Sequence, residues 1–313
     1  MITVVIPTVG RPSLRDTVAA VGPDVPVVVV DDRRAAGASG VLESLPAHVR
    51  VVRSGGRGPA AARNAGWRAV HTPWVVFLDD DVVPGPGWAE AVRTDLAGLP
   101  GDVAGSQGRI VVPLPRGRPP TDAERHTAGL EDALWVTADM AYRRRVLESL
   151  GGFDERFPGA YREDSDLALR ALRAGHRLVR GERVTEHPVR ADGFWSSVRF
   201  QRGNADDVLM RRLHGPGWRA VAGDGPGRLR RHAVTTAAGL AAALLAGAAR
   251  SRRAPLVLAG VAGAAWAMLT AEFAWRRVAP GPRTPEEVLR MAVTSVLIPP
   301  VACAHRLRGE LRR

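Results

Sequence analysis

Short, uniformly apolar runs alternate with helix-like stretches through the first 80 residues of this chain. A run such as 25–30, which is all valine after its proline, indicates a strand that is covered on both faces, because a half-exposed strand alternates apolar and polar residues. The alternation predicts a doubly wound, mostly parallel sheet flanked by helices. The predicted strands are 2–7, 25–30, 49–53 and 75–78, and the predicted helices are 13–21, 36–45 and 60–70.

The pattern loosens after residue 81. A stretch rich in Pro, Arg and Gly at 113–120 predicts a loop, and the Gly- and Pro-rich 215–232 predicts a linker. This linker divides the chain into a predicted α/β domain, 1–214, and an apolar helical region, 233–313. Within the first domain we also predict strands at 103–112, 135–140 and 178–184, and helices at 88–99, 143–150, 165–174 and 194–213.

Three apolar stretches in the C-terminal region are candidates for membrane association. Residues 233–249 carry no charge and residues 254–275 carry a single acid, and their lengths lie at the short end and the middle of the transmembrane range. The third stretch, 291–304, is broken by Pro299-Pro300, which predicts a segment that lies at the interface or re-enters. The alternative is a pair of Ala-rich helices that pack on the soluble domain or in a dimer.

The excess of positive charge lies in the same region. The formal net charge of the 313 residues is +12, all 44 basic residues are arginine, and 14 of them fall within 228–313 together with only four of the 32 acids. A basic apolar tail suits an anionic membrane surface better than nucleic acid. Because every loop of the tail is basic, the positive-inside rule defines no topology. A shallow hairpin in the inner leaflet, at the cytoplasmic face, avoids placing three arginines outside.

Two further features bear on the compartment. Cys303 is the single cysteine, which excludes an internal disulfide and a cysteine-based zinc cluster. The N-terminus begins with a strand-like run and shows no signal-peptide pattern. The single cysteine is consistent with a reducing compartment.

Three consecutive aspartates, 79–81, directly follow the strand at 75–78. Three adjacent carboxylates repel each other unless a cation lies among them, and carboxylate oxygens are the ligands that Mg²⁺ and Mn²⁺ prefer. Ligands also bind at the ends of strands in open parallel sheets. The triplet therefore predicts either a metal–diphosphate site or a solvated acidic turn.

Three more polar clusters are expected at the same edge of the sheet: the loop 7–12, Asp31-Asp32, and Arg63-Asn64 after a Gly-rich loop. A nucleotide-sugar site requires a carboxylate for the base or ribose, a cation for the diphosphate, and a metal held by carboxylates. Each cluster alone is also explained by a turn, a helix cap or a surface arginine. Their joint order and spacing favour the binding site.

In this order the clusters resemble family 2 glycosyltransferases. The resemblance implies the GT-A fold, a Rossmann-like, mostly parallel mixed sheet flanked by helices, and covers residues 4 to about 190 but not the tail. The matching segments are Val5-Ile6-Pro7-Thr8, Val28-Val29-Val30-Asp31-Asp32, Ala62-Arg63-Asn64-Ala65-Gly66, Phe77-Leu78-Asp79-Asp80-Asp81, Gly151-Gly152-Phe153-Asp154-Glu155 and Arg162-Glu163-Asp164-Ser165-Asp166-Leu167-Ala168-Leu169-Arg170.

The resemblance implies a donor site and a divalent metal, Mn²⁺ or Mg²⁺. Asp31, with Asp32, is expected to contact the nucleobase and ribose. The family's Asp-x-Asp motif corresponds to Asp79 and Asp81, and His187 is a further candidate ligand, although a His before a Pro also commonly ends a strand. The implied donor-nucleotide residues are Pro7, Thr8, Asp31, Asp32, Arg63 and Asp80, and the implied metal ligands are Asp79, Asp81 and His187.

The resemblance also implies that Asp164 is the catalytic base. Asp164 precedes the predicted helix 165–174, whose dipole would lower its pKa, whereas Glu163 and Asp166 would raise it. Asp166 itself is interpreted as a capping residue. The candidate acceptor residues, for which core packing is the alternative, are Trp135, Asp139, Phe153 and Trp195.

These features predict an inverting, hexosyl-type glycosyltransferase that uses a nucleotide-sugar donor. A lipid-linked or cell-envelope glycan acceptor follows if the tail binds membrane. One alternative is a nucleotidyltransferase, for which Val9-Gly10-Arg11 is only a weak form of the expected loop. The other is a non-catalytic nucleotide-sugar-binding or membrane scaffold protein, against which the intact acidic set argues.

Overall fold

The computed structural model describes residues 1–35, 37, 39–190, 193–249 and 253–312. They form two compact units, which we call the sheet unit and the helical unit. The sheet unit comprises Met1–Pro113, Thr127–Val189 and Trp218–Asp224, and the helical unit comprises Leu114–His126, Arg190–Gly217 and Gly225–Arg313. This division differs from the predicted domains because the chain passes repeatedly from one unit to the other.

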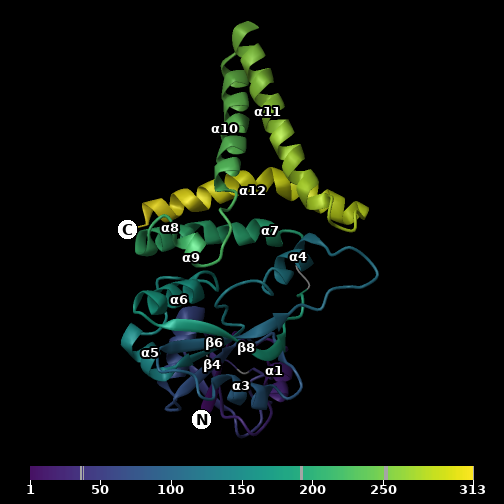
Figure 1. The fold of residues 1–313 in the computed structure, drawn as a ribbon. Coiled ribbons are helices and arrows are strands. Elements are labelled where there is room, and N and C mark those ends of the chain that lie inside the picture. The colour runs from purple at the N-terminus through teal and green to yellow at the C-terminus, as the bar shows by residue number, and fades with distance from the viewer. Residues whose placement is uncertain (36, 38, 191–192, 250–252, 313) are drawn as a thin grey trace. The chain divides into compact units, whose positions relative to one another are not determined.

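A mixed eight-stranded sheet forms the centre of the sheet unit (Figure 1), with the strand order β3-β2-β1-β4-β7-β6-β8-β5. The strands are β1 (Ile2–Thr8), β2 (Val27–Asp31), β3 (Arg50–Arg53), β4 (Trp74–Leu78), β5 (Val83–Pro84), β6 (Val103–Val111), β7 (Asp139–Arg143) and β8 (Arg177–Glu186). The first four strands are parallel, β7 is antiparallel to β4 and β6, and β8 is parallel to β6 and antiparallel to β5.

Helices cover both faces of this sheet, namely α1 (Leu14–Val21), α2 (Pro59–Arg68), α3 (Trp88–Leu96), α5 (Arg144–Leu150) and α6 (Glu163–Arg173). Successive side chains of a strand point to opposite faces. Val4 and Val76 thus belong to a core with α1 and α3, whereas Val5 and Val75 belong to a second core with α2, α5 and α6. Burial on both faces explains the continuous valine runs.

Two predicted elements of the sheet unit are wrong. Positions 36 and 38 of the predicted helix 36–45 lie outside the described residues, and residues 40–44 form turns. The predicted strand 135–140 begins only at Asp139, because Trp135 has a left-handed backbone (φ 65°) and donates its N–H to the Gln107 side chain instead of a strand.

The helix between residues 122 and 128 was not predicted. In α4 (Asp122–Ala128) the Thr121 hydroxyl accepts from the Glu124 N–H at 3.3 Å, and the Glu124 carboxylate accepts from the Thr121 N–H at 2.7 Å. This is a reciprocal capping box, for which Thr-x-x-Glu is the sequence signal.

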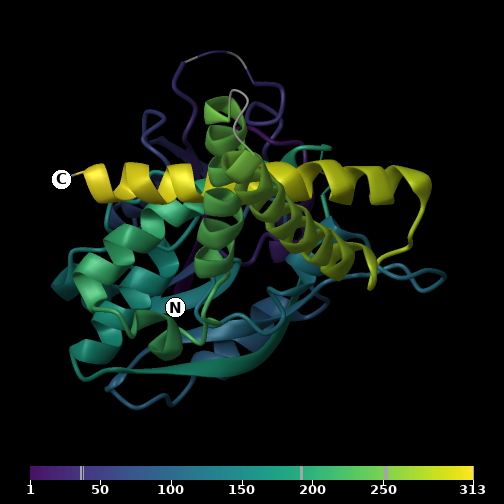
Figure 2. The ribbon, with the colours of Figure 1, turned by 90° about the horizontal axis from the view of Figure 1, so that it is seen from above.

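The helical unit contains a hairpin of two long helices, α10 (Leu229–Ala248) and α11 (Arg253–Val278), and α12 (Pro285–Leu311) runs across the open end of this hairpin (Figures 1 and 2). The shorter elements are α7 (Ser196–Arg199), the 3-10 helix η1 (Phe200–Arg202) and α8 (Gly203–His214). Two described helical segments, Ala254–Val278 and Pro285–Leu311, are long and apolar enough to cross a membrane by length and composition. Arg250 and Arg252, between the predicted apolar stretches, lie outside the described residues.

The predicted break at Pro299-Pro300 is wrong, because α12 continues through both prolines. Each proline removes one N–H donor from the helix, but α12 packs along α8 and α10, which holds it in one piece.

Candidate active site

Predicted site residues from three segments lie at one edge of the sheet, where the parallel strands β1, β2 and β4 end. Thr8, the last residue of β1, is in register with Asp31, the last residue of β2. On the other side of β1, β4 ends at Leu78 and is followed directly by Asp79–Asp81. The sheet topology therefore brings these three clusters together as predicted.

Asp79, Asp81 and His187 form a cluster in which one potential ligand atom of each residue lies within 4.8 Å of the others. The short strand β5 follows the aspartates and pairs with the end of β8, so that Val83 is opposite Glu186 and His187 comes next to Asp81. The His187 Nε2 lies 4.0 Å from the Asp81 Oδ2. The Asp81 and His187 side chains are nearly buried, whereas the Asp79 side chain is 31% exposed.

The donor set of this cluster fits a divalent cation. Carboxylate oxygens are preferred by Mg²⁺ and Mn²⁺, and a neutral imidazole nitrogen extends the set toward transition metals such as Mn²⁺. Ligand atoms about 2.1 Å from one cation lie within about 4.2 Å of each other, which is comparable with the observed spacing.

Arg63 connects this cluster to the segment that carries Asp164. Its Nη2 donates to Asp79 Oδ1 at 2.9 Å and its Nη1 donates to Glu163 Oε1 at 2.6 Å. Arg63 is only 2% exposed, and its guanidinium carbon lies 5.7 Å from the centre of the Phe153 ring. Burial lowers the pKa of Arg63, but the charges of Asp79 and Glu163 outweigh this effect, so the pKa is raised and Arg63 stays charged.

Asp164 lies in the first turn of α6, because the helix begins at Glu163 and not after Asp164 as predicted. Burial raises the pKa of Asp164, while the hydrogen bond from the Ser165 N–H at 2.7 Å and the charge of Arg63 oppose the rise. Burial also raises the pKa of Glu163 to about 7, against the charge of Arg63. A carboxylate with a raised pKa is a better proton acceptor than an ordinary aspartate.

The interpretation of Asp166 as a capping residue is wrong. Its side chain is fully buried and accepts from the Arg170 Nε at 2.8 Å. This i,i+4 ion pair explains the acid inside the helix.

Asp80, expected at the donor nucleotide, points back toward β1. Its Oδ2 accepts from the Thr8 hydroxyl and its Oδ1 from the Arg11 Nη1, both at 2.6 Å. Asp80 is 2% exposed, so its visible role is to join the ends of β1 and β4. Arg11, in the polar loop 7–12 that was expected at this edge, is 41% exposed in its side chain, and no individual role was predicted for it.

Asp31 and Asp32 have different partners although they are adjacent. The buried Asp31 accepts from Arg33 through both oxygens, at 2.8 and 2.9 Å, and this hydrogen bonding, opposed by burial, lowers the pKa of Asp31. Asp32 accepts from the Ser54 hydroxyl and from the N–H groups of Arg57 and Gly58. Asp32 therefore anchors the Gly-rich loop that precedes α2.

Asn64 has a structural role that sequence reasoning missed. Its Nδ2 donates to the Phe153 carbonyl and to Glu155, and its Oδ1 accepts from the Phe153 N–H and the Trp67 indole, all at 2.9 Å. A Cβ at Gly152 would lie 2.3 Å from that Oδ1. The segments 62–66 and 151–155, which both match the family pattern, therefore lie against each other in the structure.

The residue before α6, Arg162, adopts a left-handed backbone with φ 78°. Its guanidinium lies 4.3 Å from the Tyr161 ring centre and 4.7 Å from the Trp218 ring centre, and it forms an ion pair with Asp224. Trp218 begins the short helix α9 (Trp218–Val221) and is 4% exposed. Part of the predicted linker 215–232 is therefore packed beside the segment that carries Asp164.

The four candidate acceptor residues do not form one group. Asp139 is fully buried and accepts from the Arg183 Nε at 2.8 Å, the Trp88 indole and the Thr185 hydroxyl, so it belongs to the interior. Phe153 is 3% exposed and packs edge-on against Phe77 at 5.1 Å.

The other two acceptor candidates are more accessible. Trp135 is half-buried in the sheet unit. Trp195 is 46% exposed and belongs to the helical unit, where its ring lies edge-on to Phe194.

Three comparisons identify similar proteins. Residues 3–151 match the family model described as glycosyl transferase family 2. The chain is 30% identical over 234 residues to the pre-mycofactocin glycosyltransferase of two strains of Mycobacterium tuberculosis, an alignment that covers 67% of this chain and 48% of the relative. The chain thus spans about half the length of the curated relatives that it matches.

Among solved structures, the mannosyltransferase PcManGT from Pyrobaculum calidifontis, in complex with GDP-Man and Mn²⁺, has a similar fold. The TM-score is 0.57 at 20% sequence identity, and the match covers 100% of this chain and 87% of that chain. The predicted resemblance and the predicted GT-A architecture, with apolar C-terminal helices, are confirmed.

Proposed function

Because residues 3–151 match the model of glycosyl transferase family 2, we propose that this protein is a metal-assisted, inverting glycosyltransferase. It moves a hexosyl group from a nucleotide-diphosphate donor to an acceptor hydroxyl. The observation that carries the proposal is the double contact of Arg63 with Asp79 and Glu163. Through this side chain the carboxylates suited to a cation are held at a fixed place relative to the start of α6, which carries Asp164 next to Glu163.

The donor binds at the edge where β1, β2 and β4 end. Asp31 contacts the nucleobase and ribose once Arg33 releases it, and Pro7 and Thr8 line the same edge. Asp79, Asp81 and His187 would hold the Mn²⁺ or Mg²⁺ that neutralises charge on the leaving diphosphate. The negative charge of the donor is a reason for the exposed Arg11 to lie at this edge.

Asp164 acts as the general base in a single displacement. The acceptor oxygen forms a bond to the anomeric carbon as its proton passes to Asp164, and the bond from that carbon to the diphosphate oxygen breaks. The configuration at the anomeric carbon inverts because attack and departure occur on opposite sides. The nucleoside diphosphate leaves with the electron pair of the broken bond.

The acceptor is proposed to be a lipid-linked or cell-envelope glycan, reached at the cytoplasmic face of a membrane. The support is the surface of the helical unit, where Leu240 and Leu244 of α10 and Leu256 and Val261 of α11 are all more than half exposed. Large contiguous apolar surface is rare on soluble proteins and marks membrane or protein contact. The relatives are named pre-mycofactocin glycosyltransferases, so pre-mycofactocin is a further acceptor to assay.

A thermal-shift screen of nucleotide sugars tests this function. A ligand that binds only the folded state raises the melting temperature, so we expect one donor class to raise it with Mn²⁺ present and to have little effect with chelator. The same donor should then release nucleoside diphosphate when an acceptor is added. If no nucleotide sugar shifts the melting temperature in a Mn²⁺-dependent way, the proposed function is wrong.

A further inference from the structure

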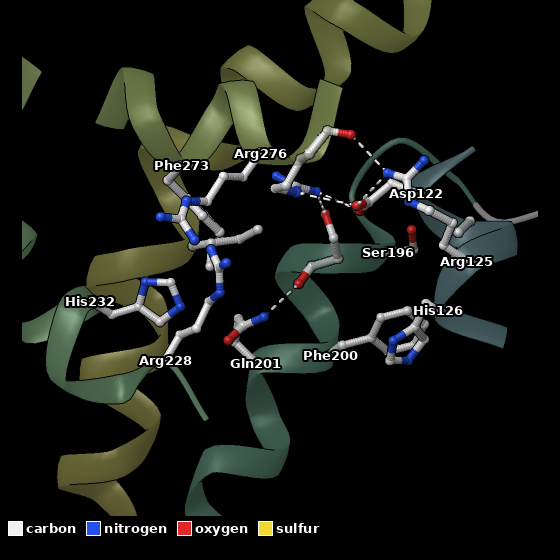
Figure 3. Close-up of a pocket in the computed structure, with 14 residues that line it drawn as sticks. Asp122, Arg125, His126, Ser196, Phe200, Gln201, Arg228, His232, Phe273 and Arg276 are labelled. Atoms are coloured by element: carbon white, nitrogen blue, oxygen red, sulfur yellow. Dashed lines mark hydrogen bonds and ion pairs between the residues drawn. The ribbon is translucent and has the colours of Figure 1, made fainter. Parts of the chain in front are cut away.

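A cavity of about 370 Å³ lies within the helical unit, among α4, α7, η1 and the open end of the α10–α11 hairpin. The start of α10 contributes Arg228 and His232, and the end of α11 contributes Phe273, Arg276 and Arg277. In Figure 3, Arg228 and His232 lie on one side of the cavity, and Asp122 and Arg125 lie on the other. None of these residues takes part in the proposed transfer reaction.

The lining of this cavity is strongly basic. It contains four arginines, at 125, 228, 276 and 277, and one carboxylate, Asp122. Asp122 accepts from Arg277 at 2.7 Å and from Arg125 at 3.4 Å, so two cations share one anion. Arg276 pairs with Glu272 at 2.6 Å. Positive charge therefore remains in excess at the cavity.

Arg277 is fixed in place, which makes the basic wall rigid. It is 8% exposed, and besides Asp122 it donates to the hydroxyls of Thr294, Ser295 and Ser197 at 2.8 to 3.0 Å. A guanidinium that is held by several hydrogen bonds loses little side-chain entropy when a ligand binds beside it.

Arg228 differs from the other three arginines. Within the described part of the chain, no carboxylate lies within ion-pair distance of it, and its contact is the Phe273 ring, whose centre is 5.6 Å away. Burial and the charges of Arg228 and Arg277 lower the pKa of the neighbouring His232 to about 4. The cavity thus offers an available cation beside a neutral imidazole that can donate or accept a hydrogen bond.

The surface around the cavity is apolar along the hairpin and basic at its open end. Exposed Leu240, Leu244 and Leu256 lie farther along α10 and α11, whereas an ion pair from Arg231 to Glu272 at 2.9 Å joins the two helices beside the cavity. A lipid with a phosphate group complements this surface, because its apolar chain can contact the apolar hairpin while its anionic head group contacts the basic open end.

We propose that this cavity binds the phosphate group of an anionic membrane phospholipid, with Arg228 as its principal cation. This inference rests on the proposed membrane attachment of the helical unit. If the hairpin enters the apolar layer, its basic open end lies at the depth of the head groups, where clustered arginines attract anionic lipid. Arginine matches a phosphate through paired hydrogen bonds.

The test uses the full chain in an uncharged detergent. The melting temperature is measured with dioctanoyl phosphatidylglycerol, with dioctanoyl phosphatidylcholine, and with inorganic phosphate. We expect a concentration-dependent rise with phosphatidylglycerol and little change with the other two. Arg228→Gln should weaken the apparent affinity for phosphatidylglycerol about tenfold, as expected for the loss of one charged hydrogen bond.

Arg230→Gln is the matched control. It removes the same charge only two residues along the chain, but the Arg230 side chain is exposed and does not line the cavity. Equal weakening in both variants, an equal rise with phosphatidylcholine, or an equal rise with inorganic phosphate would overturn the assignment. Flotation on neutral vesicles separates the two proposals. If the wild-type protein floats but has the same affinity for phosphatidylglycerol as Arg228→Gln, only the proposed phosphate site in the cavity is contradicted. If the wild-type protein does not float, the proposed membrane attachment is contradicted as well.

Discussion

Arg63 is the side chain on which the geometry of the candidate site depends. Its motif, Arg63-Asn64, was recognisable in the sequence, but its partners Asp79 and Glu163 were not, because they lie 16 and 100 residues away along the chain. Asp32 and Asp80 illustrate the same difficulty. Their positions at the ends of strands were predictable, but whether each faces a ligand or ties down a loop depends on neighbours that only the folded chain supplies.

Replacement of Arg63 by Ala should destabilise the protein by about 3–5 kcal/mol, because it leaves the buried Glu163 carboxylate without its cation. Activity should fall with it. Arg63→Lys keeps the charge but offers one ammonium in place of two separate donors, so we expect partial recovery of stability and little recovery of turnover. Denaturant unfolding and an assay of released nucleoside diphosphate measure both effects.

The control for this substitution is Arg68→Ala on the same helix, where the side chain is 51% exposed. It should change stability by less than about 0.5 kcal/mol. Equal loss of stability in the two variants would show that the Arg63 contacts do not stabilise the site.

The pH dependence of transfer should reveal the raised pKa of Asp164. A proton acceptor must be deprotonated, so kcat/KM should fall as the pH is lowered through the pKa of the free enzyme. Because burial raises that pKa above the usual 3.8, the midpoint of the acid limb should lie above that of an ordinary aspartate. The positive charge of Arg162 lowers the same pKa, so Arg162→Gln should move the midpoint to higher pH. A midpoint that is not raised above the usual 3.8 of an aspartate would exclude Asp164 as a buried base.

At the scale of elements, the strands were the most predictable part. Continuous valine runs have few explanations other than strands buried on both faces, and the structure has them there. The helix α4 was also predictable, because Thr121 and Glu124 have the spacing of a capping box. By contrast, the Gly- and Pro-rich composition of 215–232 indicated a linker. The neighbouring sequence does not reveal that Trp218 packs against Arg162, because the two residues are far apart along the chain.

The packed helix α9 should support the base. Trp218→Ala removes a nearly buried ring that covers the Arg162 guanidinium, and large-to-small changes of this kind cost about 3–5 kcal/mol. We expect kcat to fall more than the KM for the donor changes, because Arg162 adjoins Asp164 and not the donor edge. Val221→Ala in the same helix, at a position that is 59% exposed, is the control. Unchanged kcat in Trp218→Ala would contradict this role of α9.

At the scale of the whole molecule, composition predicted a basic apolar C-terminal region but not the division of the chain. The helical unit also takes in Leu114–His126 and Arg190–Gly217, which no change of composition marks. The charge asymmetry along the sequence is nevertheless reflected in the helical unit, where arginines gather at the open end of an apolar hairpin.

The 313-residue chain should float with neutral phospholipid vesicles. The double variant Leu244→Glu, Leu256→Glu places two charges on exposed positions of α10 and α11 and should reduce the floating fraction severalfold, because charged groups are costly in the apolar layer. Val51→Glu, at an exposed position of the sheet unit, is the control and should float like wild type. Wild-type protein that stays in the soluble fraction would contradict membrane attachment.

The most direct measurement of the central claim compares Asp81→Asn and Asp164→Asn in one pair of assays, Mn²⁺-dependent donor binding and transfer. Asp81→Asn should lose Mn²⁺-dependent binding of the donor. Asp164→Asn should bind the donor normally but transfer about 10²–10⁴-fold more slowly, the usual contribution of a general base. If both variants bound and transferred like wild type, the division of metal binding and proton transfer between Asp81 and Asp164 would be wrong.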